Sequence, residues 1–192
     1  MIHETIITTL NEDGSTHIAP MGVRVEDGLY RIAPFKPSTT LDNLLRTQQA
    51  VINLTDDVRI FAGCLTGRYD WPCRTAAAIQ GRVLEAALAH VEVQVQEQED
   101  DPVRPQFFCR VVRRAEHAPF AGFNRAQAAV IEAAILVSRL SMLPQEKVDS
   151  EMAYLQIAVD KTAGERERQA WDWLQQALRQ YREQAGREAA GT

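Results

Sequence analysis

A β-hairpin signal near the start of the chain constrains the fold more than any other feature. Two runs with strand character, residues 4–10 and 16–25, flank the turn Asn11-Glu12-Asp13-Gly14-Ser15, which has Asp-Gly at its centre. A second tight turn, Glu26-Asp27-Gly28, leads into a third strand-like run that ends at Ala33. Because such short connections join antiparallel neighbours, the chain is expected to begin as an antiparallel sheet.

The stretch 34–45 joins this third strand to an amphipathic helix and has the composition of an anion site. Lys36 supplies a cation, and Ser38, Thr39 and Thr40 supply hydroxyl groups. A helix N-terminus leaves backbone N–H groups unpaired and carries roughly half a positive charge. A phosphate bound there would therefore gain hydrogen bonds and a favourable field together.

Helix capping explains the same hydroxyl groups equally well. Ser38 or Thr39 would accept a hydrogen bond from the first turn, and Asp42 would close a capping box on Thr39. Because the pattern S/T-x-x-D is common at helix starts, this stretch alone does not decide between phosphate binding and capping.

The strand signals continue after this helix. Residues 50–55 form a short apolar run that is typical of a buried strand, and residues 76–86 are also expected to form a strand. Alternation is clearest in residues 90–97, where Val91, Val93 and Val95 are expected to face one side, and the expected partner of this run is 106–114. The proline-bearing segment 100–105 between them predicts a hairpin loop.

The hydrophobic period changes beyond residue 118. An Ala-rich helix is expected from Asn124, its N-cap, to Leu143, followed by helices over 146–159 and 164–185. In the last helix, large apolar residues recur at spacings of three and four, which predicts a buried stripe of Trp171, Leu174, Leu178 and Tyr181. We therefore expect a mainly β domain at residues 1–118 and a helical subdomain at residues 119–192.

Several motifs spread over most of the chain resemble those of the FMN-binding split barrels, the superfamily of flavin-reductase-like and pyridoxamine-oxidase-like proteins. The resemblance is closer to a family of uncharacterised proteins of archaea and methylotrophic bacteria, known only as a domain of unknown function. The motifs are Glu4-Thr5 with Thr8-Thr9, Ala19-Pro20-Met21-Gly22-Val23, Pro34-Phe35 with Thr39, Thr40 and Asn43-Leu44, Asn53-Leu54-Thr55-Asp56-Asp57 with Phe61, and Phe123-Asn124-Arg125-Ala126. The resemblance implies an antiparallel split β-barrel with a C-terminal helical subdomain, and a homodimer that holds the flavin near the subunit interface.

The same resemblance implies FMN as the cofactor. Its phosphate would lie at residues 36–40 and its isoalloxazine ring along residues 19–23, where Gly22 permits close approach of the backbone and Pro20 fixes the strand edge. Asn53 would hydrogen-bond the ribityl chain or the ring edge. The expected cofactor-binding residues are Pro20, Met21, Gly22, Phe35, Lys36, Ser38, Thr39, Thr40, Asn43, Asn53 and Asp56.

Each of these assignments has a structural alternative. Pro20-Met21-Gly22 is also what a bulge at a barrel edge requires. Asn53 and Asp56 are also what a solvated strand end would carry.

Two classes of function are compatible with this site. The first is a flavin-dependent oxidoreductase, with hydride or electron transfer carried by the flavin and a nicotinamide or another small molecule as substrate, because the protein offers no conspicuous acid, base or nucleophile. The second is a non-catalytic flavin carrier, or a split-barrel protein that binds another phosphorylated ligand. Fold-level analogy does not choose between them.

Composition narrows the partners and the compartment. The net charge of -5 and the pI near 5.4, without a basic stripe, argue against nucleic acid. No segment reaches the ~18 apolar residues that span a bilayer, and Met1-Ile2-His3-Glu4 does not begin a signal peptide, so we expect a cytoplasmic protein without a membrane partner.

The cysteines and histidines predict no metal site. The three cysteines, at positions 64, 73 and 109, are odd in number and lack C-x-x-C spacing. We therefore expect them to be small core or rim residues. The four histidines lie far apart in the sequence, and only His17 lies on a strand that leads to the expected flavin edge.

Overall fold

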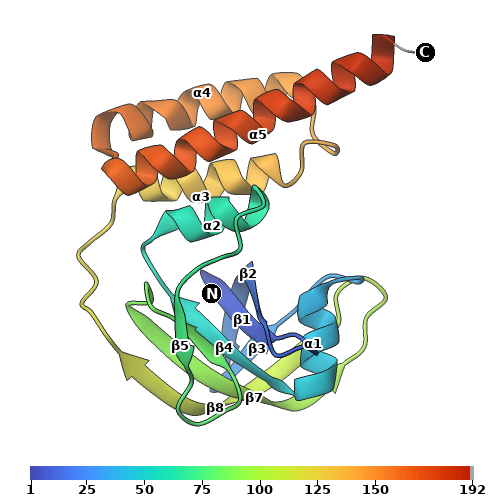
Figure 1. Ribbon diagram of the computed structural model, residues 1–192, viewed down its shortest axis with the longest axis vertical. Helices are drawn as coiled ribbons and strands as arrows, with labels where there is room; N and C mark the ends of the chain where they lie inside the picture. Colours follow the sequence, from blue (N-terminus) through green and yellow to red (C-terminus); the bar gives the residue numbers. More distant parts are fainter. Residues whose placement is uncertain (191–192) are drawn as a thin grey trace. The chain divides into compact units, whose positions relative to one another are not determined.

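The computed structural model describes residues 1–190 (Figure 1). Contacts within the chain divide it into two compact units. The first unit comprises residues 1–56 and 69–120, and the second comprises residues 57–68 together with the chain from residue 121 onward. The segment 57–68, for which the sequence suggested no helix, thus groups with the C-terminal helices.

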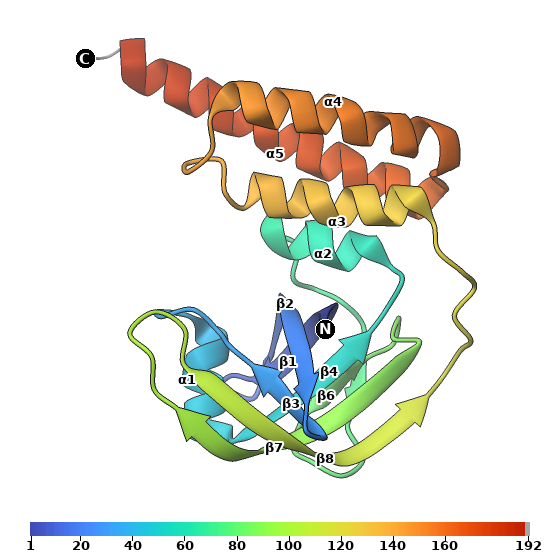
Figure 2. The same ribbon diagram turned by 180° about the vertical axis from the view of Figure 1, so that it is seen from behind.

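The first unit is a closed barrel of six antiparallel strands (Figures 1 and 2). The strand order around the barrel is β1-β2-β3-β8-β7-β4. The strands are β1 (Ile2–Leu10), β2 (Thr16–Glu26), β3 (Leu29–Ile32), β4 (Gln49–Leu54), β7 (Ala89–Glu99) and β8 (Gln106–Glu116). The antiparallel barrel and the helices that follow it confirm the predicted fold class.

Turn chemistry explains how the first three strands are connected. Gly14 has φ 81° in the β1–β2 turn, and Asp27 and Gly28 have φ 51° and 79° in the β2–β3 turn. Glycine, asparagine and aspartate tolerate this left-handed region, so both predicted turns form as the sequence indicates.

The barrel encloses an apolar core. Alternate residues of the strands point inward, and α1 (Thr39–Thr47) closes one end with Leu41 and Leu44. Val91 and Val93 are buried, which confirms the predicted inward face of β7, while Val95 is only partly buried. The buried members of this core are Ile7, Val23, Tyr30, Ile32, Leu41, Leu44, Ala50, Ile52, Val91, Val93, Phe107 and Cys109.

The predicted strand over residues 76–86 is wrong. Only β6 (Arg82–Leu84) is a strand there, and it pairs with β5 (Cys73–Thr75) as a separate two-stranded sheet. Residues 76–81 instead form a loop whose backbone N–H groups at 77, 78 and 79 donate to the carboxylate of Glu92. A side chain remote in sequence therefore takes the hydrogen bonds that a strand would have needed.

The second unit consists of four helices, α2 (Val58–Leu65), α3 (Arg125–Val137), α4 (Gln145–Thr162) and α5 (Glu165–Ala190). Asn124 caps α3 as predicted, because its side chain accepts hydrogen bonds from the N–H groups of Ala126 and Gln127. The predicted extension of this helix to Leu143 is wrong, since α3 ends at Val137. Helix α5 continues five residues past the predicted end at Ala185.

Small residues let these helices pack closely. Ala126, Ala129, Ala133 and Ala134 of α3 are buried in the core of the helical unit. From α5, Trp171, Leu174 and Leu178 enter the same core, as the spacing predicted, whereas Tyr181 remains 38% exposed.

Candidate functional site

The N-terminus of α1 is the first part of the candidate site. Ser38 is the N-cap, and its side chain accepts a hydrogen bond from the N–H of Leu41 at 3.3 Å. The alternative capping box on Thr39 is wrong, because Thr39 is already the first helical residue. Within residues 1–190, no protein atom accepts a hydrogen bond from the backbone N–H of Thr39 or Thr40. These donors remain available to a ligand.

Two cations lie beside this turn. Lys36 Nζ pairs with Asp100 Oδ1 at 2.6 Å, in an ion pair whose aspartate is mostly exposed. The Arg104 guanidinium donates to the carbonyl oxygen of Ala33 and lies 4.4 Å from the centre of the Phe35 ring. Residues 33–36 and the β7–β8 loop are thereby held together.

Thr40 is oriented by a histidine on β2. Its hydroxyl group lies 3.1 Å from Nε2 of His17, and its side chain is buried. Burial lowers the pKa of His17 below its usual value, so this imidazole is neutral at pH 7. The pair fastens α1 to β2, and Thr40 can offer a ligand its backbone N–H rather than its hydroxyl.

Two of the predicted cofactor-binding residues, Asn53 and Asn43, are buried and hydrogen-bonded within the chain. Asn53 is 0% exposed; its amide donates to Ile6 O and Thr8 Oγ1, and its carbonyl accepts from Leu84 N. Asn43 is also buried and its amide donates to the side chains of Thr9 and Asn11. The side chains of both residues therefore already have hydrogen-bond partners within the chain, as buried polar groups require.

Gly22 lies in a groove of about 480 Å³ on the outer face of the barrel. The groove is lined by Ile2, Gly22, Arg24, Arg31, Ala33, Asp101, Val103, Arg104 and Gln106. Lys36 N donates to the carbonyl of Val103 at 2.9 Å, so the groove and the turn before α1 share the same loop. The structure therefore brings Gly22 and Lys36 toward one site.

The other members of the predicted ring site lie differently. Met21 packs against the barrel core, so only its backbone is directed to the outside. Pro20 and Asp56 are half-buried and do not line the groove. Phe35 is 56% exposed, beneath Arg104. A Cβ atom on Gly22 would lie 2.8 Å from Cγ2 of Ile2, so the side chain of Ile2 lies directly over this glycine.

The sequence reasoning missed the arginines of this groove. Arg24 and Arg31 are directly opposite each other on β2 and β3, and Glu26 lies 3.7 Å from each. Like charges in a cross-strand pair are destabilising unless an anion lies between or near them. The outward alternation of Pro20, Gly22 and Arg24 along β2 is the signal that could have drawn attention to this face.

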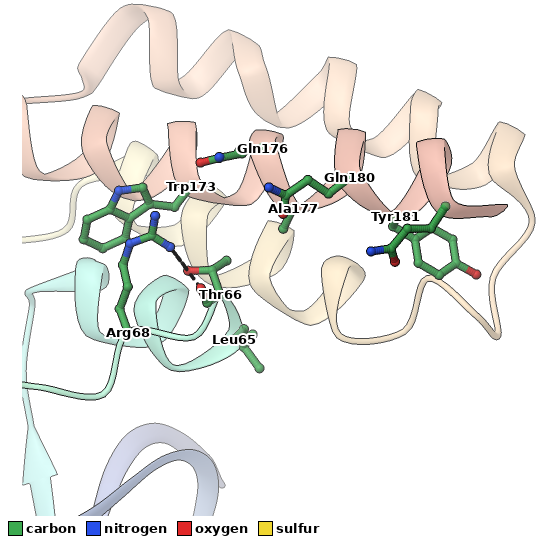
Figure 3. Close-up of a pocket in the computed structure, with 9 residues that line it drawn as sticks. Leu65, Thr66, Arg68, Trp173, Gln176, Ala177, Gln180 and Tyr181 are labelled. Atoms are coloured by element: carbon green, nitrogen blue, oxygen red, sulfur yellow. Dashed lines mark hydrogen bonds between the residues drawn. The ribbon is translucent and has the colours of Figure 1, made fainter. Parts of the chain in front are cut away.

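A second hollow lies in the helical unit (Figure 3). It has a volume of about 360 Å³, and the Arg68 guanidinium lies 4.4 Å from the Trp173 ring centre on its wall. The described residues that line it are Leu65, Thr66, Arg68, Trp173, Gln176, Ala177, Gln180, Tyr181 and Gln184, and they include no carboxylate, histidine or cysteine. This lining suits contact with a neighbour more than it suits acid–base chemistry.

The cysteines are chemically quiet. Burial raises the pKa of Cys64 and of Cys109 to about 12, and burial also raises the pKa of Cys73. A thiol needs a lowered pKa to act as a nucleophile near neutral pH, so none of the three has the properties of a reactive cysteine.

Over the residues that the structure describes, no helix is both long and apolar enough to cross a membrane.

Family models match both parts of the chain. Residues 3–118 match the model described as "Protein of unknown function (DUF447) N-terminal domain", and residues 124–176 match its companion, "Protein of unknown function (DUF447)". A comparison with curated proteins gives no match.

Solved structures with the same fold include flavoproteins. An FMN-bound protein of the DUF447 family from Methanosarcina mazei is 20% identical, with 92% of this chain and 94% of that chain covered and a TM-score of 0.79. A 2-nitrobenzoate 2-nitroreductase from Pseudomonas fluorescens is 22% identical over 59% of this chain and 64% of its own, with a TM-score of 0.51. An NADH:FAD oxidoreductase from Streptomyces globisporus is 10% identical over 60% of this chain and 71% of its own, also with a TM-score of 0.51.

Proposed function

Because this chain belongs to the DUF447 family, we propose that it is a flavoprotein that binds FMN at the groove beside Gly22 and the N-terminus of α1. The observation that carries the proposal is the FMN-bound member of the same family, whose fold matches 92% of this chain. The chemistry of the residues present is a separate and independent support.

The donor set fits the two ends of FMN. A phosphate dianion needs N–H donors and positive charge, which the N–H groups of Thr39 and Thr40 and the side chains of Lys36 and Arg104 supply. A flat ring needs a surface without bulky side chains, and Gly22 and Ala33 would provide one within the groove once the Ile2 side chain, which now lies over Gly22, moves aside. Arg24 and Arg31 would add positive charge beside that surface.

Bound FMN would supply hydride or electron transfer. The residues of the chain would bind and orient it. Lys36 would exchange its exposed partner Asp100 for phosphate at little cost, because an exposed ion pair contributes little to stability. The guanidinium groups of Arg24 and Arg31 would favour negative charge in the groove, whether on the cofactor or on a second ligand.

We further propose that a second copy of the chain covers this groove. Ile2 and Val103 line it and are 51% and 56% exposed, and Phe35 nearby is equally exposed. Exposed apolar side chains around a charged groove are typical of an interface rather than of free surface. This arrangement supports a homodimer with the flavin near the interface.

An oxidoreductase is the activity that we favour over a flavin carrier. The structural neighbours include a nitroreductase and an NADH:FAD oxidoreductase, which supports a redox role for this barrel. Anaerobic addition of NADH or NADPH to the FMN-loaded protein distinguishes the two functions. An oxidoreductase of this kind loses its visible flavin absorbance, whereas a carrier keeps it.

Titration with FMN tests the binding site. Lys36→Ala and Arg104→Ala should each weaken the binding of FMN by about 1.5–3 kcal/mol, because each removes a charge-assisted contact to phosphate. The affinity of both variants for riboflavin, which lacks the phosphate, should change little. Flavin fluorescence quenching measures both affinities.

The exposed partner of Lys36 provides the matched control. Asp100→Asn leaves the lysine free and should bind FMN at least as tightly as the parent protein. Equal losses for FMN and riboflavin would show that these cations do not contact phosphate. Absence of any binding at about 0.1 mM FMN would contradict the proposed function itself.

Gly22→Val tests the position of the ring. A valine would project its side chain into the groove, where it already meets Ile2, and should abolish the binding of FMN and riboflavin alike. The melting temperature should change little, because the terminal part of Ile2 is exposed and can move aside. A folded Gly22→Val protein that binds both flavins normally would place the ring elsewhere.

A further inference from the structure

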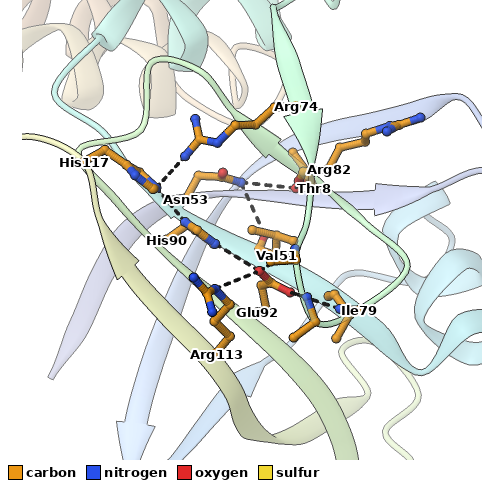
Figure 4. Close-up of polar contacts among 12 residues, drawn as sticks. Thr8, Val51, Asn53, Arg74, Ile79, Arg82, His90, Glu92, Arg113 and His117 are labelled. Atoms are coloured by element: carbon orange, nitrogen blue, oxygen red, sulfur yellow. Dashed lines mark hydrogen bonds and ion pairs between the residues drawn. The ribbon is translucent and has the colours of Figure 1, made fainter.

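A buried carboxylate organises the loop between β5 and β6 (Figure 4). Glu92 on β7 is 0% exposed. Its Oε1 accepts a hydrogen bond from Ala77 N at 2.9 Å, and its Oε2 accepts from Ala78 N at 2.6 Å and Ile79 N at 3.0 Å. Three N–H donors on one carboxyl group require that it be ionised.

His90 is in contact with Glu92 on one side of its ring and with His117 on the other. Its Nε2 lies 3.2 Å from Glu92 Oε1, and its Nδ1 lies 2.7 Å from Nε2 of His117. An ionised carboxylate can only accept, so His90 Nε2 carries a proton. The direction of the bond at Nδ1 depends on what His117 can accept.

One ring nitrogen of His117, the residue directly after β8, lies close to both Arg74 and His90. Its Nε2 lies 2.5 Å from an Arg74 guanidinium nitrogen as well as 2.7 Å from His90 Nδ1, and the two imidazole rings stack with centroids 4.9 Å apart. Because arginine can only donate, His117 Nε2 must accept through its lone pair. Nε2 of His117 therefore carries no proton while this contact holds, which leaves His117 neutral.

We propose that the contacts Glu92–His90–His117–Arg74 form an acid-sensitive clasp, which holds β5 to the barrel while His117 is neutral and releases it when His117 gains a proton. A proton on Nε2 of His117 removes the lone pair that accepts from Arg74. It also places a cation at His117 directly beside the Arg74 guanidinium. This inference uses neither FMN nor the groove.

The charged groups around His117 come from three strands. Arg74 faces it from β5 and His90 from β7, while Glu92 and Arg113 of β8, 3.9 Å apart, lie one contact further away. Burial, with the charges of Arg74 and His90, lowers the pKa of His117 below its usual value. The clasp is thus complete above the unfolded-state value near 6.5 and weakens as the pH falls below it.

The remainder of the β5–β6 sheet is fastened by groups that do not titrate. Thr8 Oγ1 donates to Arg82 O, and Asn53 Oδ1 accepts from Leu84 N. Glu92 keeps its hold on the loop to lower pH, because its backbone donors and His90 overcome the effect of burial and lower its pKa below 4.5. Mild acid should therefore leave β6 in place and leave β5 held chiefly by its pairing with β6, from which it then separates more readily.

Amide hydrogen exchange of the intact protein between pH 7.5 and 5 tests the clasp. After correction for intrinsic exchange, the protection of residues 73–76 should fall by up to about tenfold per pH unit below 6.5, because one proton is linked to opening. Amides of Val91 and Val93 in the barrel core should not change. His117→Gln should make the protection of residues 73–76 independent of pH, whatever its absolute level, and His3→Gln should behave like the parent.

Protection that does not vary with pH in the parent, or that varies equally in His117→Gln, would overturn the proposal. A direct measurement covers the case in which His117→Gln does not fold. In the parent protein, the imidazole Cε1–H resonance of His117 should titrate below 6.5, and titration at or above this value would also overturn it.

Discussion

Glutamine at position 92 should lower the unfolding free energy by about 3–5 kcal/mol, the usual loss when one partner of a buried ion pair is removed. The carboxamide keeps the size of Glu92 but has only one acceptor oxygen for the N–H groups of residues 77–79. Its NH2 group would face donors, and His90 Nε2 would lose a charged acceptor. Urea unfolding at pH 7, followed by circular dichroism, measures the difference.

An exposed glutamate on the same strand provides the control. Glu97→Gln removes the same charge at the surface of β7 and should change stability by no more than about 0.5 kcal/mol. The deficit of Glu92→Gln should also shrink in acid. A carboxylate with a lowered pKa stabilises the fold above its unfolded value, and this contribution is lost as the pH falls through the lowered pKa, below 4.5. A loss under about 1 kcal/mol at pH 7 would show that the loop does not depend on Glu92.

Alanine at position 171 should cost the helical unit about 3–5 kcal/mol, because a large aromatic side chain is removed from a closely packed core. Trp171 is 3% exposed, and its indole Nε1 donates to Gln156 Oε1 at 2.7 Å, so it also links α5 to α4. Thermal unfolding of the variant beside the parent measures the loss of stability. Sedimentation of the same two proteins measures any change in the mass of the assembly in solution.

Trp173 is the matched comparison, two residues further along α5. It is only half-buried and lies against Arg68, so Trp173→Ala should cost less than Trp171→Ala. Equal melting temperatures for the two variants would contradict the assignment of Trp171 to the core. Unchanged melting and unchanged mass for Trp171→Ala would mean that α5 is an appendage to the helical unit.

Local signals in the sequence predicted much of the fold. The turns at Gly14 and Gly28, the N-cap at Asn124 and the inward valines of β7 all formed as expected. Each of these features depends on contacts between residues only a few positions apart, or on the period of a strand, so the sequence contains the whole cause. The family resemblance, which the family models confirm, supplied the closure of the strands into a barrel.

The candidate site was only partly predictable. The turn before α1 was proposed from residue types and Gly22 from the family resemblance, and the structure connects both to the β7–β8 loop. Residue type could not show that Asn53 is used inside the barrel by Leu84, which is 31 positions away. Nor could it show that Arg24 and Arg31 share a groove with Arg104, whose guanidinium binds a carbonyl 71 positions away.

The sequence by itself determined where strands turn, where helices are capped and which faces are apolar, because those choices are made by neighbouring residues. Tertiary structure alone decided what the polar side chains do. Glu92 is one acid among the 26 acidic residues of the chain until the barrel places three backbone N–H groups and His90 around it. A buried charge is stable only with such partners, and the closure of the barrel brings them from distant parts of the chain.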